Sequence, residues 1–316
     1  FNDNSFIPDK PYDVVFACTG ELYRLVGLVP RPAGEVLKIW HPVVSFIPYN
    51  NARELERIEA LKKRRPGALY TPKRQEPYED KASKIGALAD AIILIGNEWV
   101  KNTYPKVLHE KMSLITVTAS PFGLSKRRGE YVPKEREFLW YFGVGAVRKG
   151  LDLLLEVFAK HPEWILNIVG PLSREKDFFK IYEEECKLLN IRYHGYLSPQ
   201  SEEFARVTGR SFCFIAPTAT ESISTAAATM LQLGLYPLVS RDAGIDLPKG
   251  AGMYLEDCDL AEIEEKVKRV YEMPAERLEE GVAQTQAFAL HEFSREKFRS
   301  TMEAFLERIL KVRGLL

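Results

Sequence analysis

Cysteine and histidine are scarce in this sequence, and neither positive nor negative side chains are in excess. Its 316 residues include four cysteines and five histidines, and 44 basic residues balance 44 acidic ones. A nucleic-acid-binding surface usually needs a basic excess, so no nucleic-acid partner is expected. Cys18, Cys186, Cys213 and Cys258 lack metal-ligand spacing, and we interpret them as free thiols of a cytoplasmic protein. The histidines are equally scattered and predict no metal site.

Long apolar runs are also absent. No stretch approaches the roughly 20 consecutive apolar residues that a membrane-spanning helix needs. Apolar residues make up 46% and charged residues 28% of the chain, which is typical of a soluble globular protein. Two domains are expected at this length, because a single hydrophobic core stops growing at about 250–300 residues.

Short apolar runs alternate with amphipathic stretches from about residue 137 onward. The runs are typical of buried strands, and the stretches repeat apolar side chains at helical spacing. This alternation predicts right-handed βαβ units and a parallel, doubly wound sheet. The predicted strands are residues 138–142, 164–169, 191–194, 212–216 and 237–240, and the predicted helices are residues 151–160, 174–189, 200–207, 222–233, 260–271, 275–290 and 295–311.

The first 130 or so residues show the same alternation less completely. A thin Rossmann-type domain of four strands is predicted, and two explanations stay open. Either the domain is reduced, or its first strands lie upstream of Phe1, where no initiator Met stands. Residues 121–133 are rich in Gly, Pro and basic residues and are predicted to link the domains. The predicted strands are residues 14–19, 36–40, 91–95 and 114–118, and the predicted helix is residues 52–65.

A glycine-rich turn at residues 143–150 separates a predicted strand from a predicted helix. Gly143 and Gly145 would let the backbone approach a phosphate, and the helix N-terminus favours negative charge. Arg148 and Lys149 would add positive charge. The spacing matches neither a Walker A loop nor a dinucleotide fingerprint. A tight turn with two solvated basic residues remains the alternative interpretation.

Residues 216–226 join a buried strand to a helix and carry one carboxylate among Ser and Thr residues. Glu221 would lie in the crevice above the carboxyl ends of the strands, where open α/β sheets bind ligands. Hydroxyls can cap the helix while its first N–H groups stay free to bind an anion. The alternative is a capped helix whose glutamate only complements the helix dipole.

Taken together, these segments resemble the C-terminal domain of the family-four glycosyltransferases, also described as glycosyl transferases group 1. The resemblance implies a GT-B fold, which is an α/β fold of two Rossmann-like domains with parallel doubly wound sheets. Residues 1–133 would form the acceptor-side domain, residues 134–290 the donor domain, and residues 291–316 a helix that returns to the N-terminal domain. In the C-terminal half, the segments that carry the resemblance are, in order, KGLDLLLEVF, LNIVGP, IRYHGYL, FIAPTATES and LGLYPLVSRDAGID. In the N-terminal half the resemblance is weaker and rests mainly on ADAIILIGNEWVKNTYPK.

The resemblance also implies roles for single residues. Glu221 would contact the donor sugar, and His41 would hydrogen-bond the donor sugar or the acceptor, unless it only caps a strand. The family's second motif glutamate is Thr229 here, and a hydroxyl bonds a ribose less strongly than a carboxylate does. The family's basic residue before the loop lysine is Val144 here, and Arg148 is expected to substitute for it. The other expected donor contacts are Gly143, Gly145, Lys149, Gly150, Ser222, Ile223, Ser224 and Thr225 at the diphosphate, and Gly170, Pro171, Tyr196 and Leu197 around the base.

The implied activity is transfer of a sugar from a nucleotide-diphosphate donor, such as a UDP- or GDP-sugar, with retention of configuration. The acceptor would be a glycan or a lipid-linked glycan, as in polysaccharide biosynthesis. No cofactor is expected, and no metal ion, because no Asp-x-Asp metal motif is evident in the sequence. Two basic clusters, residues 62–65 and 126–128, are interpreted as solvated faces or as contacts with lipid headgroups at the cytoplasmic membrane face. The alternative function is a non-catalytic GT-B homologue that serves as a partner or scaffold subunit.

Overall fold

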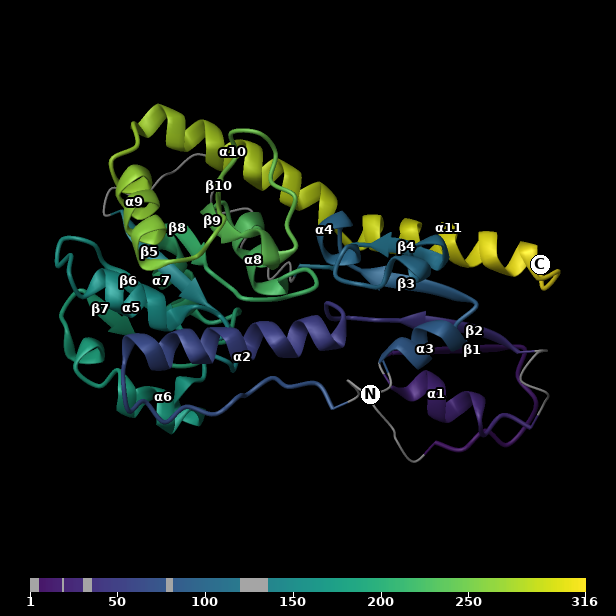
Figure 1. Cartoon of the computed structure of the whole chain (residues 1–316). Coiled ribbons are helices and arrows are strands. Elements are labelled where there is room, and N and C mark those ends of the chain that lie inside the picture. The colour runs from purple at the N-terminus through teal and green to yellow at the C-terminus, as the bar shows by residue number, and fades with distance from the viewer. Residues whose placement is uncertain (1–5, 19, 31–35, 78–81, 120–135) are drawn as a thin grey trace.

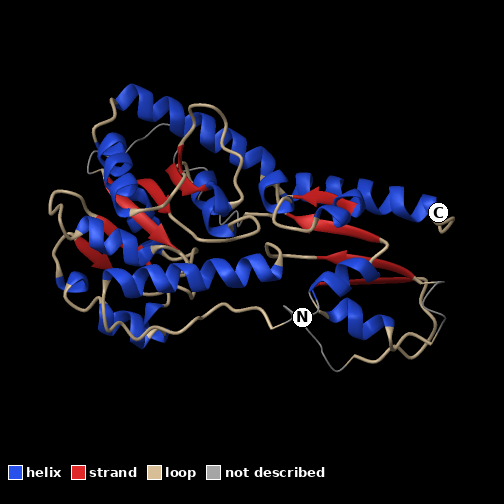
Figure 2. Ribbon diagram, in the orientation of Figure 1, coloured by secondary structure: helices blue, strands red, loops and turns tan. Residues whose placement is uncertain are grey.

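The computed structural model describes residues 6–18, 20–30, 36–77, 82–119 and 136–316. These residues form two α/β lobes side by side, each with a parallel sheet at its centre (Figure 1, Figure 2). The expected α/β class with two parallel sheets is confirmed. The predicted linker at residues 121–133 and the basic cluster at residues 126–128 lie outside the described residues.

The N-terminal sheet keeps its described strands in sequence order, β1-β2-β3-β4, with every pair parallel. Successive side chains of a strand face opposite sides of a sheet. Trp40 therefore packs against α1 and α3 on one face, whereas Ile39 packs against α11 on the other. The elements are β1 (Val14–Cys18), α1 (Glu21–Val26), β2 (Leu37–His41), α3 (Ala82–Leu88), β3 (Ala91–Ile95), α4 (Glu98–Lys101), the 3-10 helix η2 (Lys106–Lys111) and β4 (Met112–Ile115).

The four predicted N-terminal strands are confirmed to within a few residues. Helices α1 and α3 were not predicted. They contain six and seven residues, about two turns each, which is too short for an apolar period of 3.6 residues to be recognised.

The C-terminal sheet has the doubly wound order β10-β9-β8-β5-β6-β7. The order reverses between β5 and β8, and the crevice at such a reversal is where open α/β sheets bind ligands. The strands are β5 (Glu137–Tyr141), β6 (Leu166–Val169), β7 (Ile191–Tyr193), β8 (Ser211–Ala216), β9 (Tyr236–Ser240) and β10 (Met253–Leu255), of which β10 was not predicted. The helices are α5 (Leu151–Phe158), α6 (Lys176–Ile181), α7 (Glu202–Arg210), α8 (Thr225–Gln232), α9 (Leu260–Tyr271), α10 (Ala275–Glu292) and α11 (Arg295–Val312).

The single helix predicted at residues 174–189 is wrong. Two 3-10 turns, η4 (Leu172–Arg174) and η5 (Glu185–Lys187), flank α6 instead. Three successive glutamates at positions 183–185 lie at the break between the end of α6 and the start of η5. Glu185 pairs with Arg65.

Helix α2 (Ile47–Arg64) follows a strand of the N-terminal sheet but packs along the C-terminal domain (Figure 1). Ile58 and Leu61 on its buried face are 3% and 0% exposed, and both belong to the C-terminal core cluster. At its end, Arg64 forms an ion pair with the buried Asp152 of α5. The amphipathic face of α2 is therefore matched to α5 rather than to the sheet that precedes it.

The extended segment after α2 also lies on the C-terminal domain. Tyr70 is 3% exposed and donates a hydrogen bond of 2.6 Å to Glu175, and Lys73 pairs with Asp177 at 2.5 Å. The expected domain boundary at residue 133 therefore does not describe the packing. Within residues 1–133, Ile58 and Leu61 of α2 and Tyr70 after it belong to the C-terminal core cluster, and Ala68 packs against it.

Helix α11 returns to the N-terminal sheet. Ser294 caps it by accepting a hydrogen bond from the Lys297 N–H at 3.0 Å. Phe305, 4% exposed, lies in one core cluster with Ile39 and Ile93 of the N-terminal sheet. The partly buried side chains beside it are Phe298, Met302, Leu306 and Ile309. Among the described residues, no helix is both long and apolar enough to cross a bilayer.

Candidate functional site

The glycine-rich turn and the loop after β8 are packed directly against each other. Gly150 has a positive φ of +73°, and a Cβ there would lie 2.4 Å from the Pro217 carbonyl oxygen. The Ala219 N–H donates to the Arg148 carbonyl at 2.8 Å. Gly150 therefore serves close backbone packing rather than facing a phosphate, and this packing fixes the two predicted segments side by side.

Lys149 and Glu221 meet in this packing. The Lys149 ammonium forms an ion pair with the Glu221 carboxylate, and it lies 5.3 Å from the centre of the Phe142 ring. The side chains of Lys149 and Glu221 are 8% and 17% exposed. Burial, followed by the positive charges of Arg148 and Arg74, lowers the pKa of Lys149 well below its usual range. The negative charge of Glu54 opposes part of this shift.

Arg148 points away from Lys149 and Glu221. Its buried guanidinium donates to the Thr220 carbonyl at 3.1 Å, to Asn50 Oδ1 at 2.8 Å and to the Arg74 carbonyl at 3.3 Å. Burial lowers the pKa of Arg148 to about 10. The expectation that Arg148 replaces the family's missing basic residue at the diphosphate is therefore wrong: its donors fasten the loop after β8 to α2 and the segment that follows it.

The Gly145 N–H also has a hydrogen-bond partner within the protein. It donates to Glu175 Oε1 at 2.6 Å, and the Ala146 N–H donates to the same carboxylate at 3.1 Å. Glu175 is 1% exposed and also accepts from Tyr70. The expectation that Gly145 faces a phosphate is corrected accordingly. Sequence reasoning missed Glu175, because a lone glutamate after β6 carries no pattern that marks it as buried.

A pocket of about 270 Å³ opens at the carboxyl ends of β5 and β6 and at the start of α8. Leu197, which was expected to frame the base, does not line it and packs against the core instead. Tyr196 is 70% exposed and presents its ring to solvent at the pocket. The pocket gathers six residues that the sequence placed at a donor site: Gly143, Gly170, Pro171, Tyr196, Thr225 and Thr229.

The N-terminus of α8 forms one wall of this pocket. The helix begins at Thr225 rather than at the predicted residue 222, because Ser224 caps it by accepting from the Ala227 N–H at 3.2 Å. Thr229, 6% exposed, donates its hydroxyl hydrogen to the Thr225 carbonyl at 2.8 Å. Thr229 also lines the pocket. Ser222 instead donates to the Val43 carbonyl of the N-terminal domain at 2.9 Å.

His41 is the last residue of β2. Its Nδ1 lies 2.6 Å from the Ile93 carbonyl, so Nδ1 carries the hydrogen and Nε2 can accept a bond. Burial lowers the pKa of His41, partly opposed by that hydrogen bond, and the ring is therefore neutral at pH 7. Two residues later, Val43 accepts the bond from Ser222, and Ser45 donates to the Glu221 carbonyl. His41 thus stands next to the seam at which the Glu221 loop meets the N-terminal domain.

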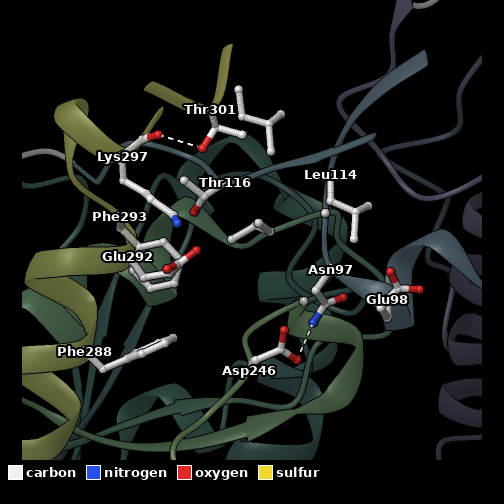
Figure 3. Close-up of a pocket in the computed structure, with 14 residues that line it drawn as sticks. Asn97, Glu98, Leu114, Thr116, Asp246, Phe288, Glu292, Phe293, Lys297 and Thr301 are labelled. Carbon is white, nitrogen blue, oxygen red and sulfur yellow. Dashed lines mark hydrogen bonds between the residues drawn. The ribbon is translucent and has the colours of Figure 1, made fainter. Parts of the chain in front are cut away.

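A second pocket, of about 450 Å³, lies on that seam and is drawn in Figure 3. It is lined from β4 of the N-terminal sheet by Ile115, from the α10–α11 elbow by Phe293, and from the loop after β9 by Asp246. The Asn97 amide donates to Asp246 at 2.8 Å across the two domains. Figure 3 shows the Lys297 side chain directed into the pocket. Ile223, expected at the diphosphate, lines this pocket and not the one at the start of α8.

An Asp-x-Asp sequence does occur in the chain, at Asp257 and Asp259, and sequence reasoning overlooked it. Asp259 caps α9 by accepting from the Glu262 N–H at 2.7 Å. Both aspartates line a pocket of about 520 Å³ between α2 and α9, where Arg53 and Arg57 also lie. The described residues contain no group of three or more His, Cys, Asp or Glu side chains placed to hold a metal ion.

Comparisons with known proteins agree with this architecture. The structure is similar to sucrose-phosphate synthase from Thermosynechococcus elongatus, with a TM-score of 0.69 and 13% identity, covering 95% of this chain and 74% of that chain. It is similar to α,α-trehalose 6-phosphate synthase from Burkholderia multivorans, with a TM-score of 0.69 and 12% identity, over 97% and 72% of the chains. It is also similar to Anabaena HepE in complex with UDP and glucose, with a TM-score of 0.58 and 14% identity, over 90% and 80%.

At such low identities these likenesses show the fold alone, a GT-B fold of two Rossmann-like domains. No curated protein matches the chain in sequence. The family profile described as glycosyl transferases group 1 matches residues 125–285, just over half of the 316 residues. The matched span contains the glycine-rich turn, the pocket at the start of α8, Lys149 and Glu221. The chain therefore belongs to the family of glycosyl transferases group 1.

Proposed function

We propose that this protein transfers a sugar from a nucleotide-diphosphate donor, a UDP- or GDP-sugar, to a glycan or lipid-linked acceptor with retention of configuration. One observation carries the proposal. The pocket at the start of α8 is lined by Phe142, and the Lys149 ammonium that pairs with Glu221 lies 5.3 Å from the same ring. A nucleotide in the pocket would thus have its phosphates directed toward that ion pair.

The pocket provides different chemistry for each part of a nucleotide. The exposed ring of Tyr196 can stack on a base. Gly170 lets the backbone pack closely against the Phe142 carbonyl at the edge of the pocket, because a Cβ there would lie 2.4 Å from that oxygen. Thr229 can accept a hydrogen bond from a ribose hydroxyl. The first N–H groups of α8, at Thr225 and Ala226, have no partners within the helix and attract an anion. A diphosphate would therefore be held between the helix start and Lys149.

The proposed reaction is a front-face displacement. The bond between the anomeric carbon and the leaving phosphate oxygen breaks, and a bond from the acceptor hydroxyl oxygen forms on the same face. The hydroxyl proton passes to the leaving phosphate oxygen, so no covalent intermediate with the enzyme forms. Lys149 and the N–H groups of α8 stabilise the negative charge that develops on the diphosphate. Glu221 hydrogen-bonds the hydroxyls of the donor sugar.

The acceptor side is proposed to lie on the domain seam. The seam pocket offers Asp246, Asn97 and Thr116 as hydrogen-bonding groups for sugar hydroxyls, beside the rings of Phe288 and Phe293. His41 does not line this pocket, but it lies beside the seam, and its Nε2 can accept a proton or a hydrogen bond. For a lipid-linked acceptor, the exposed Lys62 and Lys63 are available for anionic headgroups, whereas Arg64 and Arg65 are occupied by ion pairs.

Calorimetric titration with UDP, GDP and their common sugar conjugates tests this function. Micromolar binding of one donor supports it. Proton NMR of the transferred sugar then reports the anomeric configuration: an inverted product contradicts retention. No heat with any donor, in a protein that melts cooperatively, contradicts the function.

One observation favours the alternative, a non-catalytic partner or scaffold subunit. Glu175 satisfies the N–H groups of the glycine-rich turn, and Glu221 satisfies Lys149, so two groups that could bind phosphate already have partners within the chain. A scaffold would bind no nucleotide yet would co-purify with a catalytic partner. The same titration therefore separates the two functions.

A further inference from the structure

The proposed diphosphate site is short of positive charge. Lys149 faces it, but the Lys149 charge is balanced by Glu221 in the same ion pair. Arg148 is turned away and donates to three oxygens between the domains. A departing nucleoside diphosphate carries at least two negative charges, and fixed cations aimed at it are what phosphate-transfer sites use for stabilisation. Another cation near the glycine-rich turn would supply what is missing.

Arg74 lies at that turn, although it comes from the segment after α2. A Cβ on Gly145 would stand 3.2 Å from the Arg74 Cγ, so the Arg74 stem crosses directly over this glycine. Gly145 has a φ of +105°, and its missing side chain leaves room for the crossing. Arg74 is exposed, and among the described residues its side chain forms no ion pair. Its charge also contributes to the lowered pKa values of Lys149 and Arg148.

The backbone of Arg74 is held in place from both sides. The carboxylate of Glu54, which is 0% exposed, accepts the Lys73 N–H at 2.9 Å, the Arg74 N–H at 3.1 Å and the Gln75 amide at 2.9 Å. From the other side, the Arg148 guanidinium donates to the Arg74 carbonyl at 3.3 Å. These hydrogen bonds fix the backbone of Arg74, whereas its exposed side chain can reach a ligand.

We infer that Arg74 binds the diphosphate of the donor and supplies the positive charge that the glycine-rich turn itself lacks. The inference rests on the proposed function and names a contact that comes from outside the donor domain. A guanidinium can donate two parallel hydrogen bonds to phosphate oxygens, which an ammonium cannot do. The segment after α2 thus contributes a binding group as well as structural contacts.

Paired titrations test the inference. Binding of UDP and of uridine, or of GDP and guanosine if the protein prefers GDP, is measured for wild type, Arg74→Ala, Arg74→Lys and the neighbouring control Lys73→Ala. Losing one charge-assisted bidentate contact should weaken diphosphate binding roughly 10- to 100-fold in Arg74→Ala and less in Arg74→Lys. Binding of the nucleoside, which has no phosphate, should stay unchanged in every variant. Lys73→Ala should match wild type, because Lys73 pairs with Asp177 instead.

The possible outcomes distinguish failure of the inference about Arg74 from failure of the proposed function. If wild type binds the nucleoside diphosphate and Arg74→Ala binds it equally well, the inference is wrong and the function stands. If Arg74→Ala loses diphosphate and nucleoside affinity in equal measure, Arg74 only supports the pocket and the inference is again wrong. If wild type binds no nucleoside diphosphate, the proposed function falls and the inference falls with it. Melting temperatures, expected to agree between Arg74→Ala and Lys73→Ala, exclude a folding defect.

Discussion

The Lys149 ammonium contacts the Glu221 carboxylate, and this contact joins the turn after β5 to the loop after β8. Each group neutralises the other within the protein. A bound diphosphate would therefore draw Lys149 partly away from Glu221 and leave the carboxylate for the hydroxyls of the donor sugar. The ion pair thus couples the two halves of the proposed donor site.

Replacing Glu221 should affect both activity and stability. The sequence alone suggests that Glu221→Ala costs the fold at most about 1 kcal/mol, because a carboxylate at a helix start packs against little. The structure changes that expectation, since the variant leaves the buried Lys149 ammonium without its partner. We expect Glu221→Gln to abolish turnover and to lower the free energy of unfolding by about 1–3 kcal/mol. Chemical denaturation and a transfer assay measure the two effects.

The double variant Glu221→Gln/Lys149→Met serves as the control. It removes both charges, so its stability should recover toward that of wild type while its activity stays lost. Full transferase activity in Glu221→Gln would contradict the proposed role of Glu221.

Thr229 tests whether the pocket at the start of α8 binds the ribose. Thr229→Val keeps the shape and removes the hydroxyl, so donor affinity should fall by about 0.5–1.5 kcal/mol, the value of one neutral hydrogen bond. Thr229→Glu restores the carboxylate expected from the family resemblance, and its charge-assisted bond should tighten donor binding. Calorimetry with the donor measures both variants. An unchanged affinity in both would mean that Thr229 only packs α8.

Gly150 and Gly195 provide a matched pair of substitutions. Both have a φ of +73°, but a Cβ on Gly150 would lie 2.4 Å from the Pro217 oxygen, whereas a Cβ on Gly195 would have no atom within 4 Å. Gly195→Ala should cost only the backbone strain, on the order of 1 kcal/mol. Gly150→Ala should lower the free energy of unfolding by about 1–3 kcal/mol more than Gly195→Ala does, because overpacking a protein core costs about this much. Equal losses in thermal denaturation would show that the loops can separate freely.

Because of His41, the free energy of unfolding should fall as the pH is lowered below 6.5. Its pKa in the folded protein is lowered below the ordinary value of 6.5 by burial, so the unfolded chain binds the proton more readily. Its contribution to stability is therefore fully present above pH 6.5 and is lost as the pH falls from 6.5 to the folded pKa. His41→Asn, whose amide can still donate to Ile93, should remove this slope. NMR titration of the His41 ring should give a midpoint below 6.5, and a midpoint above it contradicts the burial.

The donor domain should not fold without α2. A fragment of residues 134–290 lacks Ile58, Leu61 and Tyr70, which belong to the C-terminal core cluster. Losing several large buried side chains costs about 2–5 kcal/mol each, which is comparable to the whole stability of a domain. We expect the fragment to show no cooperative melt, and the peptide of residues 47–77 to restore one. A fragment that melts cooperatively without the peptide would show that α2 is only an accessory.

Much of the C-terminal domain could be predicted, because β5, β8 and α9 carry strong local periodicity and the order of the segments matched a family. The pocket residues Gly143, Gly170, Tyr196 and Thr229 followed from the same order. What failed depended on contacts between distant segments. Nothing local shows that Arg148 turns toward Asn50, or that Glu175 occupies the N–H groups of the glycine-rich turn. The destination of α2 failed for the same reason, since its amphipathic face fits either sheet.

The course of α2 also limits how the two lobes can move. The chain passes from one lobe to the other after β2, before α3, between β4 and β5, and between α10 and α11. Two lobes joined by neighbouring connections can swing apart as rigid bodies, but connections at separate points of the seam oppose such a rotation. Relative motion of the two lobes would then be limited to small displacements, with α2 remaining packed on the C-terminal core.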